Sequence, residues 1–149
     1  MALRPPLDPI EQRELLDDLT GLVVDAMPDG WRELIIDYRQ LGGHRHVATG
    51  LTGADGAMRV WEPPDRAWDL FARLREGMYV PDAGAWYSCR YILEAPRSFR
   101  TIYNMAAEPA FNPPPPEHAF VVEQEYFPRS EANRPAWFRD GLARAVKND

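Results

Sequence analysis

The sequence predicts an α+β fold in which an antiparallel sheet of about five strands packs against an N-terminal helix, a middle helix and C-terminal helices. Helical periodicity appears near the N-terminus and over residues 65–78, and segments rich in aromatic and β-branched residues come in pairs separated by short turns. The 149 residues are 45% hydrophobic and 27% charged, which is typical of one globular domain spanning residues 1–149.

The first predicted helix starts at Asp8 and Pro9, which occupy the N-cap and first helical positions, with Glu11 placed to complete a capping box. The apolar residues that follow recur at intervals of three and four, which predicts one core-facing stripe: Ile10, Leu15, Leu16, Leu19, Leu22, Val23, Ala26 and Met27. Pro28 ends this helix. Residues 1–7 are expected to be a flexible leader, and they have neither a long apolar run nor a signal-peptide layout.

Five strands are predicted from residue type and turn signals. Residues 31–40 and 44–52 flank Gly42-Gly43 as a hairpin, and a turn at residues 53–56 leads to a short third strand near residues 58–61. Residues 85–93 and 98–103 predict a second hairpin around residues 94–97. Strand alternation in 85–93 places one set of side chains on each face: Trp86, Ser88, Arg90 and Ile92 on one, and Tyr87, Cys89, Tyr91 and Leu93 on the other, which we expect to be more buried.

Three helices and one rigid connection complete the prediction. Residues 65–78 form a helix that covers one sheet face, residues 117–126 form a short helix, and Pro135 starts a final amphipathic helix. Between them, residues 108–116 end in four successive prolines, which remove backbone donors and favour an extended surface connection.

The net charge of the chain restricts the kinds of partner that we expect. Seventeen basic residues against 23 acidic ones give a formal charge of −6, which disfavours binding to nucleic acid but favours encounter with a basic protein partner. No apolar stretch is long enough for a membrane span, and the single cysteine, Cys89, cannot form an intramolecular disulfide. We therefore expect a cytoplasmic protein without a membrane or nucleic-acid partner.

No residue pattern indicates a cofactor or a metal. His44 and His46 alternate along a strand and share a face, but no third ligand follows nearby, so we interpret them as a polar strand face and leave adventitious metal binding open. Cys89 lies mid-strand among aromatic residues and is interpreted as a small buried hydrophobe rather than a nucleophile. The glycine pairs lack the spacing of a dinucleotide or phosphate loop.

Two alternatives to a protein-binding function stay open. A small hydrolase or transferase would gather Glu123, Glu125, His118 and Tyr103 around a cleft. A small-molecule or peptide-binding module would use the sheet face that carries Trp86 and Arg90.

Several motifs in the C-terminal half resemble the YezG-like immunity proteins of bacterial polymorphic toxin systems. They are, in order, Trp86-Tyr87, Tyr103-Asn104, Glu108-Pro109 with Phe111, Phe127-Pro128-Arg129, and Pro135 with Trp137. The order of elements is similar over nearly the whole chain, whereas Met105-Ala106-Ala107 departs from the more acidic or aromatic residues expected there. The resemblance implies an antitoxin that is not an enzyme, needs no cofactor, and neutralises a cognate protein toxin by direct binding.

Candidate contacts with that toxin lie where the chain leaves the second hairpin. Asn104, Glu108 and Phe111 are at a strand exit and on a proline-stiffened loop, where side chains are presented at little ordering cost. Glu117 and Glu123, which follow on the short helix, complete the predicted partner-binding set. Trp86, Phe127 and Trp137 are interpreted as aromatic anchors of the tail on the core.

Overall fold

The fold is a five-stranded antiparallel sheet with helices on one face and at one end. The computed structural model describes residues 3–147. Its elements follow in the order α1 (Pro9–Ala26), β1 (Glu33–Leu41), β2 (His44–Thr52), β3 (Met58–Arg59), α2 (Arg66–Gly77), β4 (Ser88–Glu94), β5 (Ser98–Asn104), α3 (His118–Tyr126), a 3-10 turn (Glu131–Asn133) and α4 (Ala136–Lys147). The strand order is β3-β2-β1-β4-β5, and every neighbouring pair is antiparallel. The predicted α+β class is confirmed.

The β1–β2 hairpin turns at Gly42 and Gly43, as the sequence predicts. Gly42 has a φ of +57°, a left-handed conformation that glycine adopts without strain. A side chain there would also press on the carbonyl oxygen of Ala119 in α3. The turn therefore needs glycine both for its own backbone and for the close approach of α3.

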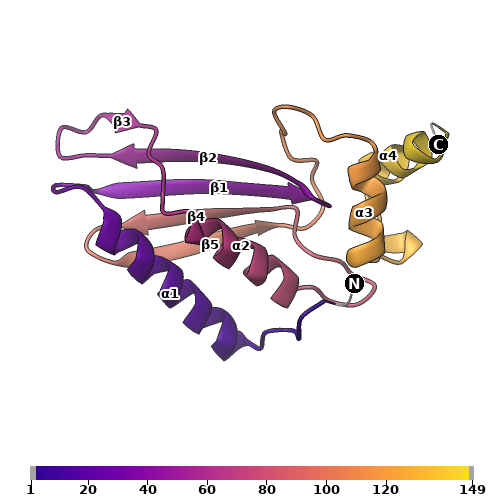
Figure 1. Cartoon of the computed structure of the whole chain (residues 1–149), viewed down its shortest axis with the longest axis horizontal. Helices are drawn as coiled ribbons and strands as arrows, with labels where there is room; N and C mark the ends of the chain where they lie inside the picture. The colour runs from indigo at the N-terminus through magenta and orange to yellow at the C-terminus, as the bar shows by residue number, and fades with distance from the viewer. Residues whose placement is uncertain (1–2, 148–149) are drawn as a thin grey trace.

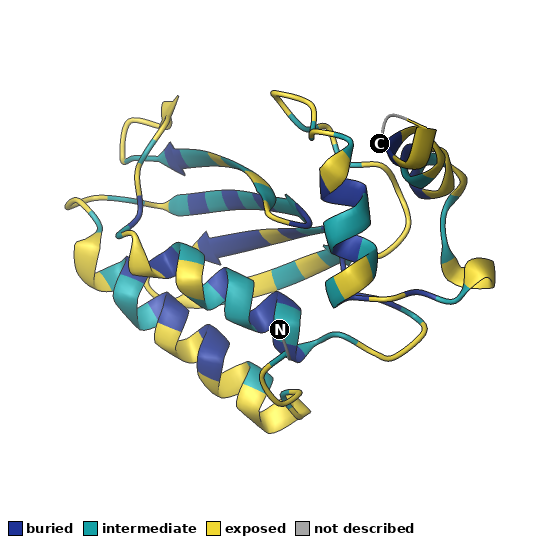
Figure 2. Cartoon of the chain, turned by 45° about the vertical axis from the view of Figure 1, so that its right-hand side comes forward, coloured by how far each residue is buried: buried dark blue, intermediate teal, exposed yellow. Residues whose placement is uncertain are grey.

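Helices α1 and α2 cover one face of the sheet (Figure 1). At the start of α1, Asp8 accepts a hydrogen bond from the Glu11 amide, and the Glu11 carboxylate accepts one from the Asp8 amide, which confirms the capping box. The apolar stripe of α1, α2 and the inward-facing strand residues form the main core, which includes Leu19, Val23, Leu34, Ile36, Tyr38, Phe71, Leu74, Trp86, Cys89, Tyr91 and Leu93. Figure 2 shows this burial along the facing sides of the sheet and both helices.

A second, smaller core joins α3 and α4 to the end of the sheet. Its buried members come from the end of β1, the segment before β4, and the two helices: Leu41, Tyr87, Ala119, Phe120 and Phe138. Trp137 packs edge-to-face against Tyr87 with ring centroids 4.7 Å apart. The C-terminal helices are thus attached to the sheet through aromatic contacts, as expected for Trp137.

The predicted face assignment before β4 is wrong for Trp86. A bend at Tyr87 precedes the strand, so regular alternation begins only at Ser88. Trp86 is 1% exposed in the main core together with Cys89 and Tyr91, whereas Tyr87 is buried in the second core. Arg90 is exposed on the opposite face, so these residues do not form the aromatic platform expected for a binding module.

The described part of the N-terminal leader lies against α2. The Leu7 amide donates a hydrogen bond of 2.9 Å to the Gly77 carbonyl, and Arg4 forms an ion pair of 2.6 Å with Glu76. Arg73 donates a further hydrogen bond to the Pro5 carbonyl. These contacts place the described part of the leader beside α2, and residues 1–2 lie outside the described range. Within residues 3–147, no helix is long and apolar enough to cross a membrane.

Candidate partner-binding site

The loop between β5 and α3, residues 105–116, forms no helix or strand and lies beside the end of the β1–β2 hairpin (Figure 1). We call it the proline loop. Asn104, the last residue of β5, folds the start of the loop into a turn. Its side-chain amide donates to the Ala107 carbonyl, and its carbonyl oxygen accepts hydrogen bonds from the amides of Ala106 and Ala107. Asn104 therefore positions the loop, because its own polar groups are already occupied within it.

Two further contacts hold the proline loop in place. The Trp137 indole N–H donates a hydrogen bond of 2.7 Å to the Ala106 carbonyl. His44 Nε2 donates one of 3.0 Å to the Pro113 carbonyl, and the His44 ring packs against Phe111 with centroids 5.4 Å apart. The loop is thus fixed at its start by residues of β5 and α4, and farther along by His44 of β2.

Several side chains of the proline loop face solvent, Met105 and Glu108 among them. Met105 is 41% exposed and Glu108 is exposed, whereas Phe111 is half-buried and packs against the second core. Among the predicted contacts on this loop, Glu108 is the one that is exposed. Phe111 is placed mainly to anchor the loop.

The predicted role of Glu123 at a partner surface is wrong, whereas Glu117 lies at the surface. Glu117 is half-buried at the start of α3, with its carboxylate 4.0 Å from Arg144. Glu123 is 1% exposed. One of its carboxylate oxygens accepts a hydrogen bond from Arg75 at 2.6 Å, and the other accepts one from the Gly42 amide at 2.8 Å. Glu123 therefore fixes α3 to α2 and to the β1–β2 turn.

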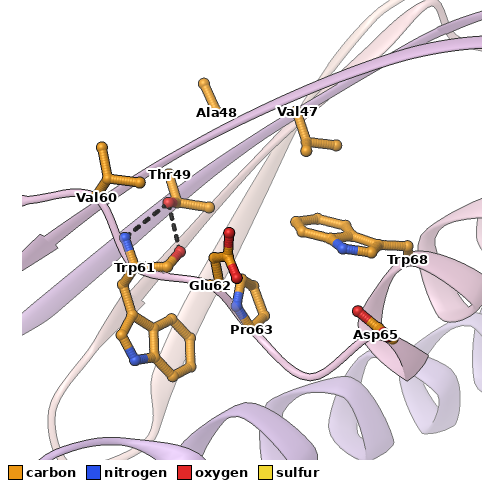
Figure 3. A pocket seen from close by; sticks show the side chains of 9 residues that line it. All are labelled: Val47, Ala48, Thr49, Val60, Trp61, Glu62, Pro63, Asp65 and Trp68. Atoms are coloured by element: carbon orange, nitrogen blue, oxygen red, sulfur yellow. Dashed lines mark hydrogen bonds between the residues drawn. The ribbon is translucent and has the colours of Figure 1, made fainter.

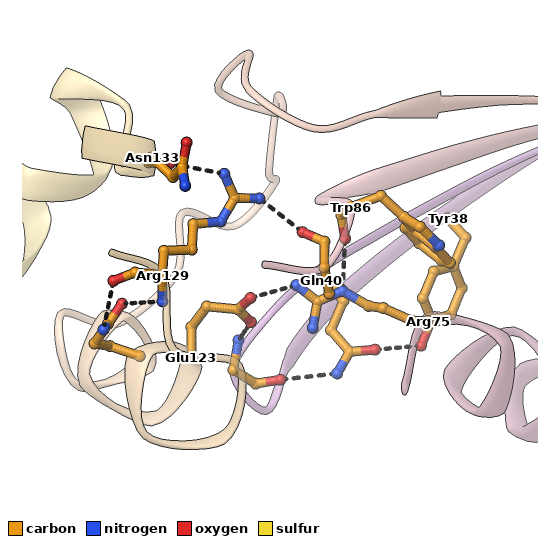
Figure 4. Close-up of polar contacts among 10 residues, drawn as sticks. Tyr38, Gln40, Arg75, Trp86, Glu123, Arg129 and Asn133 are labelled. Atoms are coloured by element: carbon orange, nitrogen blue, oxygen red, sulfur yellow. Dashed lines mark hydrogen bonds and ion pairs between the residues drawn. The ribbon is translucent and has the colours of Figure 1, made fainter. Parts of the chain in front are cut away.

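A second buried arginine extends this attachment (Figure 4). Arg75 also donates to the Trp86 carbonyl, and Arg129 donates to the carbonyls of Ala85 and Asn133. The Arg129 guanidinium lies 4.3 Å from the centre of the Tyr87 ring, and burial lowers its pKa from the usual value. Two arginines thus satisfy backbone carbonyls around the segment that enters β4, which explains why the C-terminal helices are held at that end.

The groups of the enzyme alternative do not share a cleft. His118 and Glu125 are exposed, Glu123 is buried in its ion pair, and the Tyr103 ring packs 5.8 Å from that of Trp86. Burial raises the pKa of Tyr103, which makes its hydroxyl a weaker acid. Burial raises the pKa of Cys89 to about 12, so its thiolate is scarce at neutral pH.

The two strand histidines are engaged by neighbouring groups. His44 is hydrogen-bonded to the proline loop, and His46 Nδ1 accepts a hydrogen bond of 3.1 Å from Arg39. Across residues 3–147, no three histidine, cysteine, aspartate or glutamate residues cluster as metal ligands would.

Sequence reasoning missed a groove of about 460 Å³ between β2 and the start of α2, which we call the β2 groove. Its lining includes two tryptophans, two carboxylates and part of β2, among them Trp61, Trp68, Glu62, Asp65, Val47 and Thr49. Figure 3 shows the Glu62 carboxylate between the two indole rings. The signal in the sequence is the alternation of tryptophans and acids around Pro63-Pro64, where strand and helix patterns alone predict only a connection.

The Thr49 side chain shapes the groove, because it bonds to the main chain of Trp61 in place of backbone pairing between strands. The Thr49 hydroxyl donates to the Trp61 carbonyl at 2.6 Å and accepts from the Trp61 amide at 3.1 Å. These bonds hold the chain beside β2 just before it turns under the sheet toward α2.

In comparisons by sequence, the chain matches no protein-family model and no curated protein.

Proposed function

We propose that this protein is a cytoplasmic immunity protein that neutralises a cognate bacterial toxin by direct binding and has no catalytic activity of its own. The proposal combines the resemblance to YezG-like immunity proteins with one structural observation, the anchored proline loop. The motifs of that resemblance include both Asn104, which folds the loop, and Trp137, which holds it.

The anchored loop suits recognition because little conformational freedom remains to be lost on binding. Ordering a flexible loop costs free energy that subtracts from affinity, and contacts from Asn104, Trp137 and His44 have already ordered this one. The loop presents an apolar side chain, Met105, and a carboxylate, Glu108, to solvent. Such a pairing supplies a hydrophobic contact and an orienting charge at one surface.

The charge of the protein fits the expected partner. Toxins of these systems are often nucleases, and a protein that binds a phosphate backbone carries a basic surface. This protein has a net charge of −6 and is therefore drawn toward such a surface. Electrostatic attraction favours binding that covers the basic surface over binding elsewhere on the toxin.

Co-expression with any toxin encoded beside this gene tests the proposal. Bacteria that produce the toxin should grow only when this protein is also made, and the two proteins should co-purify. Glu108→Lys should weaken the complex about tenfold or more, since it places a cation against a basic surface. Glu14→Lys, on the exposed side of α1, makes the same change in net charge and should leave affinity within about twofold. Failure of the wild-type protein to rescue growth or to co-purify with any neighbouring toxin would contradict the proposal.

A further inference from the structure

One edge of the sheet is open along half of β2. This strand pairs with β1 over its whole length, but on its other side only Leu51 and Thr52 pair with β3. Within residues 3–147, no strand pairs with β2 on that side from His44 to Val47, where an unpaired edge is a template for an added strand.

The direction of the free backbone groups follows from the pairing with β3. Leu51 pairs with Arg59, and alternate residues of an antiparallel strand direct their main-chain groups to the same side. Val47 and Arg45 therefore direct their amides and carbonyls to the open edge. An extended segment placed there would continue the sheet beside the proline loop, which His44 holds at the start of the same strand.

The β2 groove lies where side chains of such a segment would enter. Val47 pairs with Tyr38 and Thr49 with Ile36, so their side chains are on the face that α1 and α2 cover. Side chains of an added strand alternate in the same way. Every second one would point toward Trp68 at the start of α2, into the groove that Val47 and Thr49 line.

The chemistry of the groove selects a cation. Glu62 and Asp65 are exposed, and no ion pair or hydrogen bond among the described residues engages either carboxylate. Asp65 occupies the N-cap position of α2, yet its side chain makes no capping hydrogen bond. Trp68 stacks on Phe71 within the main core and is only half-buried, so part of its indole borders the groove. Two carboxylates beside an indole attract a lysine or arginine side chain.

We propose that the open edge of β2 and the β2 groove bind an extended segment of the protein partner through strand addition, with a lysine or arginine of that segment in the groove. The identity of the partner as a toxin rests on the proposed function. The chemistry of the site does not depend on that function. It predicts that the site prefers an extended peptide with a suitably placed lysine or arginine.

A peptide probe tests the site without a toxin. The blocked peptide Thr-Val-Thr-Lys-Thr-Val-Thr favours an extended conformation, and its counterpart with glutamine at the centre differs only in the cation. In amide and indole NMR spectra, the lysine peptide should shift the Val47 and Arg45 amides and the Trp68 indole N–H, and it should slow hydrogen exchange at the Val47 amide. It should bind about three- to tenfold more tightly than the glutamine peptide, with the difference shrinking in high salt.

The double variant Glu62→Gln/Asp65→Asn should remove the preference for lysine, whereas Glu14→Gln/Asp18→Asn, an equal charge change on exposed α1, should preserve it. Circular dichroism establishes that both variants fold. Equal affinity for the two peptides, shifts confined to other surfaces, or binding that the groove variant leaves unchanged would overturn the proposal. Peptide binding without toxin rescue would contradict the proposed function alone, and toxin rescue without peptide binding would contradict this site alone.

Discussion

Glu123 illustrates how one buried carboxylate organises the C-terminal third of the chain. Its two oxygens accept hydrogen bonds from Arg75 on α2 and from the Gly42 amide at the β1–β2 turn. The side chains of Arg75 and Glu123 are 0% and 1% exposed, so each charge is compensated by the other and not by water. Its value lies in fixing three elements relative to one another more than in net stability.

Removing that charge should therefore be costly. Glu123→Gln leaves the Arg75 guanidinium buried without its counter-ion and should lower the free energy of unfolding by about 3 kcal/mol or more. Glu125→Gln, an exposed carboxylate on the same helix, should change it by less than about 0.5 kcal/mol. Urea unfolding of both variants measures the difference. Similar midpoints would show that the pair does not hold α3 to the sheet.

The burial of Cys89 and Tyr91 should lower the stability of the folded protein at high pH. Burial raises the pKa of Cys89 from 9.0, and that of Tyr91 from 10.0, to about 12 in each case. Above pH 9 the unfolded chain loses these protons first, so the folded state binds more protons and stability falls as pH rises toward about 12. Cys89→Ala should make the fall between these limits shallower. Urea midpoints measured across this range test the slope, and identical slopes would contradict the buried thiol.

Two helical glycines show how packing decides the effect of one substitution. Gly141 in α4 faces the Phe120 ring so closely that an added Cβ would overlap it, whereas Gly21 in α1 would meet only the flexible end of Arg97 at 3.3 Å. Alanine favours a helix over glycine by about 1 kcal/mol when space allows. The same change should therefore have opposite effects at the two sites.

Gly21→Ala should raise the thermal midpoint, with a gain of about 0.5–1 kcal/mol from helix propensity. Gly141→Ala should lower it, since separating α4 from α3 costs about 1–3 kcal/mol and outweighs the same gain. Scanning calorimetry of the two variants checks the signs. Stabilisation by Gly141→Ala would mean that α3 and α4 are not packed as described.

The elements that local signals determine were predictable. The capping box at Asp8, the glycine turn at Gly42 and the two hairpins depend on neighbouring residues, so the sequence shows them directly. The role of Glu123 was not predictable, because its partners Arg75 and Gly42 are 48 and 81 positions away. A short helix with little amphipathic pattern does not reveal which of its carboxylates faces the interior.

At the scale of the whole molecule, both candidate contact surfaces, the proline loop and the β2 groove, lie beside strand β2. The proline loop is held at His44, at the start of β2, and the β2 groove borders Val47 and Thr49 on the same strand. The position of the loop was predictable from its prolines, since they exclude helix and strand. The groove was not, because it forms only when the chain after β3 passes under the sheet edge and brings Glu62 and Asp65 to the same groove as Val47.

The most direct test of the central claim is a titration of any toxin encoded beside this gene, once purified, with this protein while toxin activity is followed. If the protein is an immunity protein, activity should fall in proportion to the amount added and reach zero at a fixed stoichiometric ratio, with Glu14→Lys behaving as wild type and Glu108→Lys requiring a large excess. Undiminished toxin activity in the presence of excess folded protein would contradict the claim.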